Sequence, residues 1–141
     1  MIKRISIITV VVKDQEEALK WYVEKLGFEK RNDQKMGKNF RWLSIGLPQQ
    51  KHMEITLADW KWYGDRNKDQ IGKNTVIVLE SSNCKMDYET LKAKGVKFTC
   101  PPEEAPHGIS AVLVDLYGNP YNIVERREPT QEKPMEDQPQ K

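Results

Sequence analysis

The sequence predicts an α+β protein in which one strand–helix–strand unit is used twice. Residues Thr9–Phe28 read as a strand, a helix, a glycine and the start of another strand, and Val76–Phe98 repeat that order more weakly. A length of 141 residues suits one domain, and 38% hydrophobic with 31% charged residues indicates a soluble, surface-rich protein. We therefore expect two related modules within one domain that spans residues 1–127.

The first helix is the best specified element. It follows a β-branched run that suits a buried strand, and Asp14 with Glu17 three residues later forms the pattern of an N-cap and capping box. An apolar stripe then predicts one helix face packed on a sheet: Ala18, Leu19, Tyr22, Val23 and Leu26. Gly27 is placed to end the helix in a left-handed conformation.

The remaining elements of module one (residues 1–58) are strands separated by polar turns. We expect them at Ile5–Val12, Phe28–Arg31, Phe40–Ile45 and Lys51–Leu57. In the last strand, alternation puts Met53, Ile55 and Leu57 on one face and His52, Glu54 and Thr56 on the other. Residues 59–73 are polar and contain glycine, which favours a linker between the modules.

Module two (residues 74–127) follows the same order. Its strands are expected near Val76–Leu79, Val96–Cys100, Ile109–Val114 and Tyr121–Glu125, and the segment Asp115–Pro120 joins the last two. Its helix begins after Asn83, has a thin stripe of Cys84, Tyr88 and Leu91, and stops at Gly95. Residues 128–141 contain three prolines and no apolar periodicity, so we expect a disordered tail.

Composition excludes several classes of function. No apolar stretch approaches the roughly 18 residues of a membrane span, and no signal-peptide pattern begins the chain, so a cytoplasmic location is expected. A net charge of +2 gives no reason to expect nucleic acid as a partner. Cys84 and Cys100 lack CxxC spacing and are expected to be free thiols without a catalytic role.

Four segments together resemble the vicinal oxygen chelate superfamily, which includes glyoxalase I, extradiol dioxygenases, fosfomycin-resistance proteins and bleomycin-binding proteins. They are VVVKDQEEALKWYVEKLGF, RWLSIG, MEITL and VDLYGNPYNIVE, in this order along residues 2–126. The resemblance implies two βαβββ modules whose strands curl into an open mixed β-sheet barrel around one small-molecule site. It also implies a homodimer, the common assembly in that superfamily.

Metal-using members of the superfamily take one ligand from the first strand and one from the last strand of each module. The resemblance carries these positions to Ile7 and Glu54 in module one, and to Val76 or Thr75 and Asn122 in module two. Hydrocarbon side chains cannot bind a metal, and an amide is a weak ligand. We therefore expect no metal centre and no cofactor. The alternative set of metal ligands in the sequence is His52, Glu54 and His107.

Glu54 is the residue singled out by this reasoning, and two interpretations remain open. It can be a cavity carboxylate that binds a cationic or hydroxyl-bearing ligand or acts as a general base, or it can form a salt bridge with Arg41 inside the barrel. The other residues expected to line the site are Asn122, Arg41, Trp42, Tyr121 and His52, whereas Trp60 and Trp62 are expected in the core or an interface.

Two classes of function follow from these expectations. One is a protein that binds or sequesters a small organic ligand, because that role needs a pocket but no metal. The other is a metal-dependent lyase or dioxygenase with a rebuilt metal site, whose chemistry needs a Lewis acid. The missing ligands favour the first class.

Overall fold

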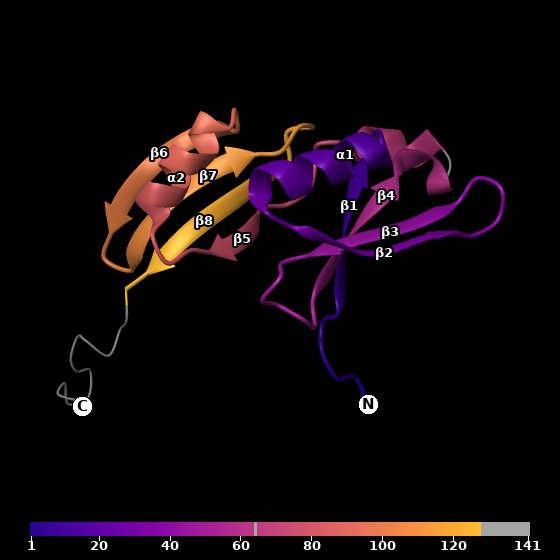
Figure 1. Cartoon of the computed structure of the whole chain (residues 1–141), viewed down its shortest axis with the longest axis horizontal. Coiled ribbons are helices and arrows are strands. Elements are labelled where there is room, and N and C mark those ends of the chain that lie inside the picture. The colour runs from indigo at the N-terminus through magenta and orange to yellow at the C-terminus, as the bar shows by residue number, and fades with distance from the viewer. Residues whose placement is uncertain (64, 128–141) are drawn as a thin grey trace. The chain divides into compact units, whose positions relative to one another are not determined.

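A computed structural model describes residues 1–63 and 65–127 (Figure 1). The chain divides into two compact units, one formed by Met1–Thr75 with Asp115–Asn119 and the other by Val76–Val114 with Pro120–Lys141. Each unit contains one four-stranded mixed sheet, so the expected α+β class with two βαβββ modules is confirmed. The expected disordered tail, residues 128–141, lies outside the described residues.

The first unit contains β1 (Ile7–Val12), α1 (Gln15–Trp21), β2 (Glu29–Lys35), β3 (Arg41–Gly46) and β4 (Glu54–Asp59). The strand order is β1-β4-β3-β2, with β1 parallel to β4 and the other neighbours antiparallel. The first ladder pair of β1 and β4 is Ile7 with Glu54. Both strands therefore begin later than the expected Ile5 and Lys51, because the residues before this pair have no ladder partner on the other strand.

One face of this sheet forms the core beneath α1. Its buried side chains are Val10, Val12, Leu43, Ile45, Ile55 and Leu57, together with Ala18 and Tyr22 from the helix. The buried Gln15 side chain donates to the carbonyls of Leu57 (2.8 Å) and Arg41 (2.9 Å), which lie beyond the two ladder pairs that join β3 to β4. Gln15 thus satisfies backbone acceptors where the two strands separate.

Helix α1 begins and ends as the sequence indicates, but its last turn is different. Oδ1 of Asp14 accepts from the Glu17 amide at 3.0 Å, and Gly27 ends the segment with φ 79°. Between them, Tyr22–Leu26 form a π-helix in which the Gly27 amide donates to the Tyr22 carbonyl. Val23, within this segment, is 40% exposed, so the expectation that it packs on the sheet is wrong.

The region between the two modules contains two short 3₁₀ helices, Trp60–Tyr63 and Asp65–Gln70. The sequence predicted only a linker here. Within this region, the ring of Trp62 stacks on the ring of Trp42 in β3.

The second unit contains β5 (Ile77–Glu80), α2 (Cys84–Ala93), β6 (Lys97–Ala105), β7 (Gly108–Val114) and β8 (Pro120–Arg126). The strand order β5-β8-β7-β6 repeats that of the first unit, with β5 parallel to β8. Asn83 caps α2 by accepting from the Met86 amide at 3.0 Å, as predicted. The core on the helix side includes Cys84, Val96, Ala111, Leu113, Tyr121 and Ile123.

The segment Asp115–Asn119 joins β7 to β8 but packs within the first unit. The Asp115 carboxylate is buried and accepts from the amides of Tyr117 (2.8 Å) and Asn119 (2.9 Å), from the Asn119 side chain (2.8 Å) and from the Tyr22 hydroxyl (2.5 Å). The DLYGN run of the sequence is therefore a turn built around one buried carboxylate.

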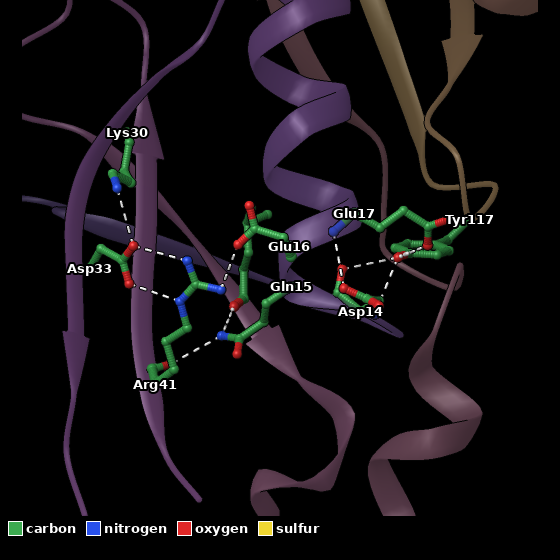
Figure 2. Close-up of polar contacts among 9 residues, drawn as sticks. Asp14, Gln15, Glu16, Glu17, Lys30, Asp33, Arg41 and Tyr117 are labelled. Carbon is green, nitrogen blue, oxygen red and sulfur yellow. Dashed lines mark hydrogen bonds and ion pairs between the residues drawn. The ribbon is translucent and has the colours of Figure 1, made fainter.

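Tyr117, in the same turn, binds the start of α1. Its hydroxyl accepts from the Asp14 amide at 3.1 Å and lies 2.8 Å from Oε1 of Glu17 (Figure 2). In a capping box the Glu17 side chain would reach the Asp14 amide directly. Here the tyrosine hydroxyl bridges the two groups. Burial of this hydroxyl, together with its hydrogen bond to Glu17, raises the pKa of Tyr117 well above its usual range.

Candidate functional site

The candidate site is the face of the first sheet that α1 does not cover. Side chains alternate along β4, so Glu54 and Thr56 point away from the helix side, where Ile55 and Leu57 are buried. The ladder pairs Thr56 with Ser44 on β3, and Ser44 with Asn32 on β2. We call Asn32, Ser44, Glu54 and Thr56 the polar face.

The Glu54 carboxylate is held within this face by its neighbours. The Ser44 hydroxyl donates to Oε1 of Glu54 at 2.7 Å, and Nδ2 of Asn32 donates to the same oxygen at 3.2 Å. Asn32 also lies 3.3 Å from the Ser44 hydroxyl. Oε2 of Glu54 accepts no hydrogen bond from any residue that the structure describes, so one oxygen is fixed and the other is available to a ligand donor.

Thr56 adds a second unused group to the polar face. The residue is 1% exposed, and its Oγ1 is buried without a hydrogen-bond partner in the described part of the chain. Leaving a buried hydroxyl unpaired costs about 1–3 kcal/mol. Sequence reasoning placed Thr56 on the face of Glu54 but assigned it no role; its alternation with two buried aliphatic neighbours was the signal that could have identified it.

Three aromatic rings lie at one end of this face. Trp42 is two residues from Ser44 on β3 and therefore shares its face. The ring of Trp62 stacks on Trp42 (6.1 Å between centroids, 14° between planes) and on Phe40 (4.3 Å, 22°). The half-buried Trp42 thus borders the polar face, and Trp62, which was expected in the core or an interface, stacks on it. That Trp42 lines a ligand site stays a prediction.

Arg41 is on the opposite face of β3, so of the two interpretations of Glu54 the salt bridge with Arg41 is wrong. Its guanidinium makes two bonds to the Asp33 carboxylate, at 2.8 and 2.9 Å, and a third to Glu16 of α1 at 3.0 Å (Figure 2). The hydrogen bonds from Arg41, assisted by Lys30, hold the pKa of Asp33 far below its usual range. Arg41 therefore joins the sheet to α1 and does not line the polar face.

Two other expected site residues lie elsewhere. Tyr121 is fully buried on the helix side of β8, so it is a core residue that a ligand cannot reach. His52 is exposed in the turn before β4 and does not share the strand with Glu54. In the second unit, Asn122 is half-buried on the other side of β8, and its Oδ1 is another buried atom without a partner among the described residues. That Asn122 faces Glu54 stays a prediction.

The two cysteines are free thiols, as predicted. Cys84 is buried in the first turn of α2, and burial, with the nearby Glu125 carboxylate, raises the pKa of its thiol. A raised pKa lowers the thiolate fraction, which makes Cys84 a poor nucleophile. Cys100 is exposed on β6.

The donors at the superfamily's metal positions do not fit a divalent metal. The ladder puts Ile7 directly beside Glu54, and puts Val78 beside Asn122, so the first-strand position of module two is Val78, which replaces the expected Val76 or Thr75. The set is then two hydrocarbons, one carboxylate and one amide. Within residues 1–63 and 65–127, no three His, Cys, Asp or Glu side chains are grouped closely enough to hold a metal ion.

None of the helices in the described residues is both long enough and apolar enough to cross a membrane. The cytoplasmic location and the homodimer stay predictions.

Comparisons with known proteins agree with this fold. An uncharacterised protein of Shewanella frigidimarina is 31% identical over 121 residues, which covers 84% of this chain and 90% of that protein. The crystal structure of UcmS2 aligns with a TM-score of 0.80 at 34% identity, covering 89% of this chain and 99% of the other. TnmS3 from Streptomyces sp. CB03234, described as an antibiotic binding protein, aligns with a TM-score of 0.76 at 27% identity, covering 89% and 98%.

The family model for the Glyoxalase/Bleomycin resistance protein/Dioxygenase superfamily matches residues 4–120, which span the first sheet, β5 to β7 of the second sheet and the DLYGN turn. The matched region includes the polar face and the helix cap as well as most of the second unit. The chain therefore belongs to the Glyoxalase/Bleomycin resistance protein/Dioxygenase superfamily.

Proposed function

We propose that this protein binds a small organic ligand on the polar face and does so without a metal ion. The observation that carries the proposal is the Glu54 carboxylate, which has one oxygen fixed by Ser44 and Asn32 and the other free of any described partner. A carboxylate held in this way is preorganised to accept a hydrogen bond from an ammonium, amine or hydroxyl group of a ligand.

The surroundings of Glu54 indicate the remaining chemistry of the ligand. Thr56, two residues along the same strand, is 1% exposed, so its hydroxyl lies beneath the site and does not contact a ligand there. The Trp42 ring, held by its stack on Trp62, offers a flat apolar surface nearby on β3. Glu54 and Trp42 together suit a compound that combines an aromatic ring with a positively charged or hydroxyl-bearing donor.

Binding is better supported than catalysis. A lyase or dioxygenase of glyoxalase or extradiol type uses a Lewis acid to polarise substrate oxygens, and the side chains at the corresponding positions cannot hold one. The structural similarity to TnmS3, whose description is that of an antibiotic binding protein, supports a role in binding or sequestering a drug-like molecule.

The test is a calorimetric titration with two flat probes of opposite charge. The cationic probe is 9-aminoacridine and the anionic probe is anthracene-9-carboxylate. We expect the cation to bind at least about tenfold more tightly than the anion, and Glu54→Gln to remove about tenfold of the cation's affinity, because hydrogen bonds to charged groups contribute roughly 1.5–3 kcal/mol.

Glu89→Gln is the matched control, since it removes the same charge from an exposed position on α2. It should leave both affinities unchanged. Failure of the cation to bind, or equal affinity in wild type and Glu54→Gln, contradicts the proposal.

A further inference from the structure

The second unit contains a cleft of about 640 Å³ at the ends of its two parallel strands. One wall is formed by Glu80, at the end of β5, with Ser81 and Ser82. The rest of the lining comes from the end of β8 and from His107, in the turn between β6 and β7. None of these residues belongs to the polar face or to the superfamily's metal positions.

The walls of the cleft are fixed by the backbone. The Ser81 amide donates to the Val124 carbonyl, and the Arg127 amide donates to the His107 carbonyl, both at 2.9 Å. Gly108 has φ 143°, and a Cβ atom there would lie 2.1 Å from the Glu125 carbonyl oxygen. Only glycine therefore allows the turn that carries His107 to lie against the end of β8.

The charges around the cleft are not balanced by one another. Glu125 is turned to the start of α2, where its carboxylate accepts from the Cys84 amide at 2.9 Å and is stabilised by the helix dipole. Arg127 lies 3.8 Å from Glu104, whose carboxylate is already bonded to Lys85 at 3.1 Å. Arg126 has no ion pair with any described residue. This leaves guanidinium donors that face the cleft and are only partly neutralised.

We propose that this cleft binds the oxyanion group, carboxylate or phosphate, of a small molecule. Arg126 supplies the main charged donor, because a guanidinium presents paired N–H groups that match two oxygens of such an anion. His107 and Ser82 also line the cleft and complete a set of donors. Glu80, which also lines the cleft and has no described partner, opposes the anion and sets an upper limit on affinity.

The experiment is a titration of the full chain with inorganic phosphate, and separately with acetate, at constant ionic strength and followed by amide chemical shifts. The amides of Ser81, Ser82, His107 and Arg127 should shift together and saturate. Arg126→Gln should weaken binding at least about fivefold. Glu80→Gln should strengthen it about twofold or more, since a like charge is removed from the same cleft.

Arg4→Gln is the matched control, because it removes one positive charge from an exposed position outside the second unit. It should leave both dissociation constants unchanged. If Arg4→Gln and Arg126→Gln weaken binding equally, or if Glu80→Gln has no effect, the cleft holds an adventitious ion only and the proposal is overturned. Because the cleft shares no residue with the polar face, this outcome leaves the function proposed above untouched.

Discussion

The hydroxyl of Tyr22 donates a buried hydrogen bond of 2.5 Å to the carboxylate of Asp115, although the two residues are 93 positions apart in the sequence. Tyr22 opens the π-helical turn of α1, and Asp115 opens the turn between β7 and β8. The bond therefore ties a segment that belongs to module two in sequence to the core beneath α1, within one compact unit.

Tyr22→Phe should lower the free energy of unfolding by about 1.5–3 kcal/mol, because the buried Asp115 carboxylate loses one of its donors while the ring still fills its space. Urea denaturation with an unchanged m-value would measure this loss. Tyr88→Phe is the control, since among the described residues the Tyr88 hydroxyl accepts only an exposed hydrogen bond from Lys92. If both substitutions lower the free energy of unfolding equally, the buried bond to Asp115 contributes no more than an exposed hydrogen bond.

Thr56→Val should raise the free energy of unfolding by about 1 kcal/mol and should leave binding of the aromatic cation unchanged, because Thr56 is buried beneath the site. Valine has nearly the same shape and removes a buried hydroxyl that has no described partner, so its desolvation cost is relieved. Thr99→Val, at an exposed position on β6, should change stability by less than about 0.5 kcal/mol. A destabilised Thr56→Val protein would mean that the hydroxyl has a partner after all.

Asp33→Asn should destabilise the protein at neutral pH and have a progressively smaller effect in acid. The pKa of Asp33 is lowered in the folded state by Arg41, so its charge contributes stability above the unfolded pKa of about 4 and loses that contribution as pH falls toward the folded value. Thermal melts of both proteins from pH 7 to pH 3 would test this. Asp69→Asn, at an exposed position in the second 3₁₀ helix, is the control and should change the melting temperature little, because surface substitutions usually change stability by less than about 0.5 kcal/mol.

Dialysis against a strong chelator should leave the melting temperature and the affinity for the aromatic cation unchanged. The reason is the donor set of Ile7, Glu54, Val78 and Asn122, which offers a single carboxylate to a divalent ion. The purified protein should also lack metal-dependent lyase activity on a glutathione hemithioacetal. Near-equimolar zinc, nickel or iron that only a chelator removes would contradict this prediction and require a different set of ligands.

The local features of the fold could be predicted from the sequence because they depend on neighbouring residues. The caps at Asp14 and Asn83 and the helix stops at Gly27 and Gly95 are all present. The limits of β1 and β4 could not be predicted, because a strand begins where its partner begins, and that partner is far away in the sequence. The π-helical turn that contains Val23 was missed because it has no local signal of its own.

The candidate site was only partly determined by the sequence. Alternation along β4 was enough to put Glu54 and Thr56 on one face, since side-chain direction in a strand has a period of two. The choice between Arg41, Ser44 and Asn32 as partners of Glu54 depended on which face of β3 and β2 each occupies, and sheet register decides that. Register is a property of paired strands, so only the tertiary structure could show that serine and asparagine, and not arginine, hold the carboxylate.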